Sequence, residues 1–137
     1  MTLDLSSRAR LTQRALPLFQ GGSLFHKVAR VVSLLEGDVR EVPLASTDVV
    51  VSVHACGALT DAILTRAMAA SARVGVLPCC HDHASSDLGG LEGWLDPAPA
   101  IDVTRVARLR SAGYEVSTQR IPGAITEKNR LIVASPR

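Results

Sequence analysis

The sequence predicts an α/β layered fold with a mostly parallel sheet. Segments rich in β-branched residues alternate with helical patterns along the 137 residues, which is typical of strands connected by helices. Aromatic residues make up only 3%, so we expect a core of Val, Leu, Ile and Ala, which suits such a sheet. The length fits one domain. We therefore expect residues 1–137 to form a single α/β domain.

The first part of the chain contains two predicted strands and one predicted helix. Residues 2–5 form a short strand candidate. Residues 6–19 follow as a helix, since two serines can cap its start and its apolar side chains share one face. The Gly-Gly-Ser sequence at 21–23 interrupts the chain. Residues 28–35 form the second strand, which ends before Gly37 and Asp38.

The middle of the chain contains the clearest strand. Residues 48–53, "DVVVSV", are β-branched and uncharged after the aspartate, as expected of a strand buried on both faces. A helix is predicted over 60–70. Residues 73–77 form a further buried strand, which Pro78 ends.

The last part of the chain begins with a loop. Residues 85–99 are rich in Gly, Pro and Asp, as in long loops. A helix is predicted over 101–112, with Gly113 closing it. Residues 114–121 and 131–134 are expected to form a closing antiparallel pair.

Two predicted strands end in cysteine and histidine, at 54–57 "HACG" and 78–82 "PCCHD". Ligands of parallel sheets bind beyond the carboxyl ends of the strands, so we expect a site here. The three cysteines are an odd number, and two are adjacent, which indicates reduced thiols rather than a disulfide framework. Neither a membrane span nor a signal peptide is recognisable. A cytoplasmic protein is therefore expected, with no membrane partner.

Several segments together resemble a class I S-adenosylmethionine-dependent methyltransferase domain: "SVHACGALTDAIL", "ARVGVLPCCHD", "GGLEGWLD", "AIDVTRVARLRSAGYEV" and "ITEKNRLIV". They are similar to the branch with an H-x-C-G-x-x-T-D helix start and a P-C-C-H strand end, and the likeness runs from about residue 31 to the end. A related tRNA ribose methyltransferase family has similar segments. The resemblance implies a Rossmann-like, three-layer α/β/α fold and S-adenosylmethionine as cofactor.

The resemblance also implies which residues contact that cofactor. Asp4 would bind the ribose hydroxyls, although it also reads as a surface residue before a helix. Asp38, with Val39 beside it, would lie over the adenine amino group; a turn after Gly37 is the alternative. Residues 54–56, which are His54, Ala55 and Cys56, would lie next to the methyl group.

The candidate catalytic residues are His54, Cys80, His81 and Asp82. His54 can act as a general base, since the pKa of histidine lies near the working pH; its ring can instead satisfy a loop carbonyl. Cys80, His81 and Asp82 are expected to line the substrate mouth. Methyl transfer needs no covalent enzyme intermediate, although a nucleophilic cysteine stays an alternative.

Other residue types in these segments invite alternative readings. Gly57 permits an unusual backbone angle, and Thr60 and Asp61 are expected to cap the helix and hold the loop. Trp94 can close as a lid or anchor its loop. Lys128, Asn129 and Arg130 precede the last strand, where they can bind phosphate or stay solvated.

The cysteines and histidines also raise the question of a metal. Structural zinc sites space their cysteines as Cys-x2-4-Cys, whereas adjacent residues in an extended segment point to opposite sides. Cys79 and Cys80 are therefore not expected to share an ion, and no metal ligands are predicted. Cys56 and His54 on the neighbouring strand can complete a set, so a metal or thiol-redox site stays a third hypothesis.

One departure from the family concerns the start of the chain. These methyltransferases open with a strand and a turn resembling D-x-G-x-G, which this sequence lacks; "QGGS" at 20–23 reads as a linker. The simplest alignment places residues 1–5 on the family's second strand. Three explanations are open: strand 2–5 takes the central position, a second chain completes the sheet as a homo-oligomer, or the sequence is truncated.

We therefore expect a methyltransferase, active or truncated, that transfers a methyl group in line. The methyl acceptor is unknown; RNA is suggested by the resemblance and by the net charge of +2. The alternative is a non-catalytic α/β module that retains the fold and acts by association with itself or a partner.

Overall fold

The computed structural model describes residues 36–137. The chain divides into two compact units, residues 1–42 and residues 43–137, which are considered separately. The described part of the first unit contains a short 3-10 helix, η2 (Val39–Glu41). Asp38 caps it, because the Asp38 carboxylate accepts a hydrogen bond of 2.9 Å from the backbone N–H of Arg40.

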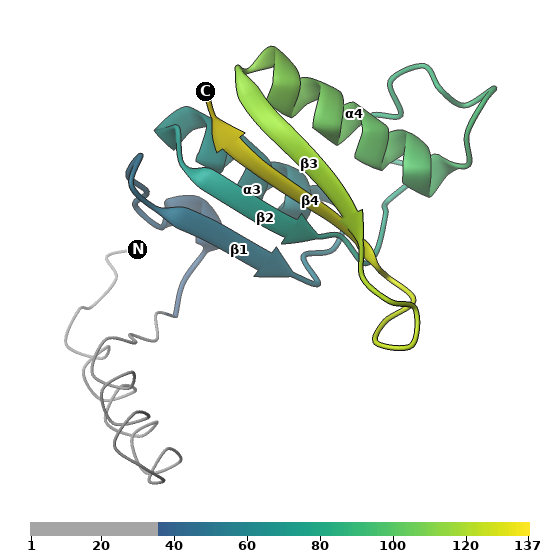
Figure 1. Cartoon of the computed structure of the whole chain (residues 1–137), viewed down its shortest axis with the longest axis horizontal. Helices are drawn as coiled ribbons and strands as arrows, with labels where there is room; N and C mark the ends of the chain where they lie inside the picture. The colour runs from purple at the N-terminus through teal and green to yellow at the C-terminus, as the bar shows by residue number, and fades with distance from the viewer. Residues whose placement is uncertain (1–35) are drawn as a thin grey trace, which may run out of the picture. The chain divides into compact units, whose positions relative to one another are not determined.

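The second unit is built on a four-stranded sheet with the order β1-β2-β4-β3. β1 and β2 run parallel, whereas β4 is antiparallel to both of its neighbours (Figure 1). The strands are β1 (Val49–Val53), β2 (Arg73–Leu77), β3 (Tyr114–Arg120) and β4 (Arg130–Pro136). The sheet is therefore mixed.

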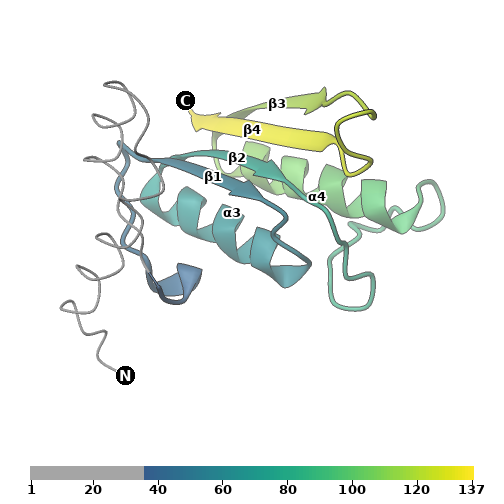
Figure 2. The same cartoon turned by 90° about the horizontal axis from the view of Figure 1, so that it is seen from below.

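Two helices, α3 (Ala58–Ala70) and α4 (Pro97–Ser111), pack against the same face of this sheet (Figure 2). α3 connects the two parallel strands, as a β-α-β unit requires. The core lies between the helices and the sheet and includes Leu64, Ala67, Val76, Ile101 and Leu109. No helix within residues 36–137 is both long and apolar enough to cross a membrane.

Most of the predicted elements between residues 48 and 137 are confirmed. The strand over 73–77 has the predicted bounds, and the two last strands form the predicted antiparallel pair. α3 starts two residues earlier than predicted. α4 starts at Pro97 rather than 101, because proline is well suited to the first turn of a helix. The strands predicted at 2–5 and 28–35 and the helix at 6–19 lie outside the described residues.

Two expectations about the sheet need correction. A mostly parallel sheet in three layers was expected, whereas residues 43–137 have one parallel and two antiparallel strand pairs, in two layers. Burial on both faces was expected for β1, yet Val49, Val51 and Val53 are 59%, 72% and 56% exposed. The reason is that both described helices cover the opposite face. The face opposite the two described helices carries an apolar hollow of about 430 Å³.

Tyr114, the first residue of β3, contacts the backbone where α3 ends and β2 begins. Its side chain is buried, and its hydroxyl oxygen lies 2.9 Å from the carbonyl oxygen of Ala67 and 3.0 Å from that of Ala72. Burial raises the pKa of the Tyr114 phenol. The hydroxyl thus satisfies backbone groups where α3 ends and β2 begins.

Candidate functional site

The loops that follow β1 and β2 lie side by side, as predicted. The backbone N–H of His54 donates to the carbonyl of Leu77 over 3.3 Å, and that of Gly57 donates to the carbonyl of Cys80 over 2.8 Å. These bonds continue the parallel pairing beyond the last residues of the two strands. They hold the loops 54–57 and 78–82 together at the edge where α/β sheets bind ligands.

Gly57 allows this close approach. Its backbone has φ 51° and ψ −127°, a conformation that is essentially restricted to glycine. A Cβ atom at this position would also lie 3.2 Å from the Cβ of Asp82 in the facing loop. The prediction of an unusual backbone angle at Gly57 is therefore confirmed.

Thr60 and Asp61 hold the first loop, although by a different contact from the one predicted. No side chain caps the start of α3. The Thr60 hydroxyl instead donates to the carbonyl of Ala55 over 2.5 Å, and Asp61 pairs with Arg105. Helix capping is thus replaced by one hydrogen bond back into the loop and by the Asp61–Arg105 ion pair across to α4.

The three cysteines converge between the two loops. The Sγ atom of Cys79 lies 3.3 Å from that of Cys56 and 3.6 Å from that of Cys80. All three Sγ atoms lie within 4.8 Å of one another. The expectation that Cys79 and Cys80 point to opposite sides is wrong, because β2 ends at Leu77 and the chain is no longer a strand where the cysteines occur.

The contacts among these thiols shift their pKa values in opposite directions. The hydrogen bond with Cys79 raises the pKa of Cys56 to about 12. The bond with Cys56, followed by one with His54, lowers the pKa of Cys79 to about 7. The physical cause is that one thiol donates to the other and stabilises its thiolate. The pair therefore loses its first proton far more easily than its second.

His54 and Ala55, both predicted to contact the cofactor, differ in their exposure to solvent. His54 is exposed and has a left-handed backbone with φ 62°, which is uncommon for a residue other than glycine. Ala55 is buried, and its carbonyl is occupied by Thr60. Of these two predicted residues, only His54 is exposed to solvent.

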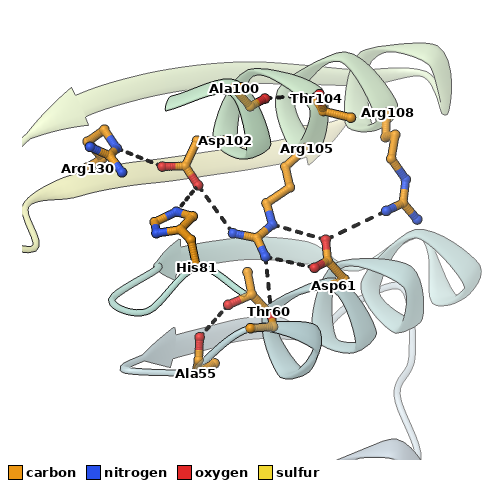
Figure 3. A network of polar contacts seen from close by, with 11 residues as sticks. Ala55, Thr60, Asp61, His81, Ala100, Asp102, Thr104, Arg105, Arg108 and Arg130 are labelled. Carbon is orange, nitrogen blue, oxygen red and sulfur yellow. Dashed lines mark hydrogen bonds and ion pairs between the residues drawn. The ribbon is translucent and has the colours of Figure 1, made fainter. Parts of the chain in front are cut away.

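His81 is held in a network of charged side chains between the second loop and the C-terminal half of the chain (Figure 3). Its Nε2 atom lies 2.8 Å from Oδ1 of Asp102, and the side chains of both residues are at least nine-tenths buried. Asp102 also accepts a hydrogen bond of 2.7 Å from Nε of Arg130. Arg130 is therefore an ion-pair partner of Asp102 rather than only a solvated loop residue.

Arg105 is the centre of this network, as Figure 3 shows. Its buried guanidinium donates to both carboxylate oxygens of Asp61, over 3.0 and 2.7 Å, and to Asp102 over 3.2 Å. A further bond of 3.2 Å reaches the carbonyl of Gly57. Burial alone would lower the pKa of Arg105, but the bonds and charges of Asp61 and Asp102 outweigh it and raise the pKa. α4 is thereby attached to both strand-end loops.

The network could not be found among the sequence candidates, yet a signal for it exists. Ile101, Arg105 and Leu109 recur at a spacing of four residues along α4, and all three are buried. An arginine within an otherwise apolar stripe requires buried acidic partners. The pairing of Arg105 with Asp61 crosses 44 residues of sequence, so its partner could not be read from local spacing.

Comparison with known protein families now adds to this geometry. The family described as a methyltransferase domain matches residues 6–87, more than half of the 137-residue chain. This chain belongs to the methyltransferase domain family. No curated protein and no solved structure shows significant similarity to it. The matched part of this methyltransferase domain contains β1, α3, β2 and both cysteine-bearing loops.

The remaining described candidate residues, Asp82, Asp38 and Val39, lie outside the strands and the α-helices. Asp82 is exposed and accepts hydrogen bonds from the backbone of Ala84 and the hydroxyl of Ser85, and the bond from Ser85 is the main cause that lowers the pKa of Asp82. In the first unit, the bond from Arg40 lowers the pKa of Asp38 to about 2. Val39 follows as the first residue of η2. Asp4 lies outside the described residues.

Trp94 does not anchor its loop to the methyltransferase domain. Its side chain is 87% exposed, whereas an anchoring tryptophan would be buried. Its possible role as a lid stays a prediction. Lys128 is exposed as well, in the turn before β4.

Proposed function

We propose that this methyltransferase domain uses S-adenosylmethionine and transfers the methyl group by direct in-line displacement. One observation carries the proposal: the family match includes both strand-end loops, and the parallel pair β1-β2 brings these loops to one edge of the sheet. In α/β sheets this edge is where cofactors and substrates bind.

The residues at this edge suit the methyl-transfer end of such a cofactor. An exposed imidazole and two exposed thiols lie around the joined loops, at His54, Cys56 and Cys80. When bound, S-adenosylmethionine supplies a methyl group made electrophilic by its sulfonium charge, so the protein mainly contributes alignment and, for some acceptors, a base. Asp4, Asp38 and Val39 are proposed for the ribose and adenine.

The buried network suggests separate roles for the two histidines. We assign proton removal to His54, because its side chain is open to solvent. His81 instead acts as a positioning residue, since its ring is buried against Asp102. Asp82 orders the second loop through its bonds to Ala84 and Ser85. Cys80 lines the mouth of the site.

The methyl acceptor is proposed to be RNA, and a cytoplasmic location is proposed with it. The support is the net charge of +2 and the resemblance of the two loops to a tRNA ribose methyltransferase family. Methylation of total RNA with radiolabelled S-adenosylmethionine tests this acceptor. Label that survives protease and disappears with ribonuclease is expected; label found only on protein would contradict it.

Calorimetric titration with S-adenosylmethionine and with its demethylated product tests the cofactor. Saturable heat from both ligands is expected. His54→Ala should retain cofactor binding and lose methyl transfer to acceptors that need a general base. The exposed His83→Ala, in the segment that follows β2, should retain both. A folded wild-type protein that gives no heat with either ligand would refute the proposed function.

The exposed valines of β1 favour a second candidate, a non-catalytic module that associates with a second copy of itself. β1 is the edge strand of the described sheet, and unpaired, β-branched edges pair readily with another chain. Light scattering of the full chain distinguishes the two. A stable dimer that dissociates in Val51→Lys but binds no cofactor would support the module, and a cofactor-binding monomer would exclude it.

A further inference from the structure

The three cysteines have the geometry of a thiolate metal site. Zinc binds thiolate sulfur at about 2.3 Å in a tetrahedron, which places neighbouring sulfur atoms about 3.8 Å apart by simple geometry. The Sγ distances from Cys79 are 3.3 Å to Cys56 and 3.6 Å to Cys80, and the whole set lies within 4.8 Å. Small movements of the side chains would bring all three sulfur atoms to one ion.

The backbone, rather than the side chains alone, brings these sulfur atoms together. Cys56 and Cys79 are 23 residues apart and lie on loops that follow neighbouring parallel strands. The bond from the Gly57 N–H to the Cys80 carbonyl, at 2.8 Å, connects the residue after Cys56 to Cys80 itself. The arrangement is therefore held by the fold, which reduces the entropy lost when a metal binds.

His54 is the candidate for a fourth ligand. It lies two residues before Cys56 in the same loop, and it is exposed. A set of three cysteines and one histidine is an established zinc ligand set. Sulfur ligands favour a soft or borderline ion over magnesium or calcium, which require oxygen.

We infer that Cys56, Cys79 and Cys80, with His54 as the fourth ligand, bind one zinc ion between the two strand-end loops. The ion attaches to three thiolates, and the protons of the three thiols leave to solvent. This inference goes beyond the proposed methyl transfer and does not rest on it. A zinc-bound imidazole offers no lone pair for proton removal, so the role of His54 as a base, proposed above, would apply to the metal-free protein alone.

Metal content of the full chain tests the inference without any measurement of activity. The protein is produced with zinc in the medium and purified under reducing conditions without chelator. About one zinc per chain is expected, as one site requires. Cys56→Ser, Cys79→Ser and Cys80→Ser should each lose most of the metal, whereas His83→Ala, an exposed histidine outside the cluster, should keep it. Circular dichroism confirms that each variant is folded.

Titration of the metal-free protein with cobalt tests the ligand set. Thiolate-to-cobalt charge-transfer bands and strong visible bands of a tetrahedral ion are expected. Loss of each cysteine should weaken the charge-transfer bands, and His54→Ala should shift the visible bands while leaving three thiolates bound. Unchanged visible bands in His54→Ala would overturn the assignment of the fourth ligand.

Thiol counting and mass measurement test two alternatives to zinc binding by these cysteines, namely a disulfide and simple packing. A mass two hydrogens below the reduced chain, with one free thiol left, would show a disulfide within the cluster and overturn the zinc site. Three free thiols in a folded protein that takes up neither zinc nor cobalt would also overturn it, since the cysteines would then be packing residues.

Discussion

The Nε2 atom of His81 lies 2.8 Å from Oδ1 of Asp102, and both side chains are buried. The contact joins the loop after β2 to α4, and Asp102 lies 21 residues beyond His81 in the sequence. Asp102 receives two further donors, Arg105 and Arg130. One carboxylate thus connects the candidate site to the part of the chain beyond the family match, which ends at residue 87.

Asp102→Asn should strongly destabilise the protein. The substitution removes a buried negative charge and leaves His81 and Arg105 without their shared partner, at a cost of about 3 kcal/mol in the free energy of unfolding. Urea denaturation measures this cost. The exposed Glu115→Gln on β3 serves as the control and should change stability by less than about 0.5 kcal/mol. Equal stability of both variants would show that the network contributes nothing.

Arg105→Lys should be costly although the charge is retained. A lysine cannot donate to both oxygens of Asp61 and also reach Asp102 and the Gly57 carbonyl, so we expect a loss of about 2 kcal/mol. Arg108→Lys is the matched control, because Arg108 is half-exposed and lies 3.7 Å from the same Asp61. That exposed pair should contribute at most about 0.5 kcal/mol. Urea midpoints that rank the two variants in the reverse order would contradict the central role of Arg105.

Gly57→Ala should separate the two strand-end loops. The alanine would occupy a backbone conformation that favours glycine, and its Cβ would press on Asp82, at a cost of about 2 kcal/mol. Gly93→Ala is the control, because nothing lies within 4 Å of a Cβ there. Thermal unfolding compares the two, and the rate of thiol modification reports whether the cysteines separate. A Gly57→Ala protein with the thermal stability and the thiol-modification rate of the wild type would argue against the tight loop contact.

The stability of the protein should fall at high pH because of Tyr114. Burial raises the pKa of this phenol above its ordinary value of 10.0. The folded state therefore holds the proton more tightly than the unfolded state, so the stabilisation is complete below pH 10 and is lost as pH rises through the folded pKa. Urea midpoints between about pH 8 and pH 11 follow this loss.

Tyr114→Phe provides the control for that pH dependence. Phenylalanine retains the packing and removes the ionisation, but it leaves the carbonyls of Ala67 and Ala72 without the hydroxyl donor. We expect about 1 kcal/mol lower stability at neutral pH and a flatter decline at alkaline pH. An identical alkaline decline in both proteins would assign the effect to other groups.

The sequence predicts local structure here better than it predicts exposure. β2 was predicted with its observed bounds, Arg73–Leu77, because Pro78 ends a largely apolar run. The same kind of run in β1 indicated burial on both faces, but Val51 is 72% exposed. An apolar residue favours burial, but it is buried only where another element of the fold packs on its side of the sheet.

The proximity of the two strand-end loops was predicted, but the contacts that their side chains make were not. The strand-end rule correctly brought residue 54 and residue 81 to neighbouring loops. It could not show that His81 turns inward to Asp102, because that contact depends on how α4 packs. The divergence expected of Cys79 and Cys80 assumed an extended chain, and the strand ends before them. Local sequence patterns could predict neither the long-range packing of α4 nor the irregular backbone after β2.

The placement of Trp94 and Tyr114 has an optical consequence. The chain has a single tryptophan and a single tyrosine, and they are 87% and 2% exposed. Indole emission will therefore be red-shifted and open to quenchers in the native state, and it will change little on denaturation. Near-ultraviolet dichroism of the phenol will instead follow loss of the core. The two chromophores thus separate what happens in the loop before α4 from what happens in the folded interior.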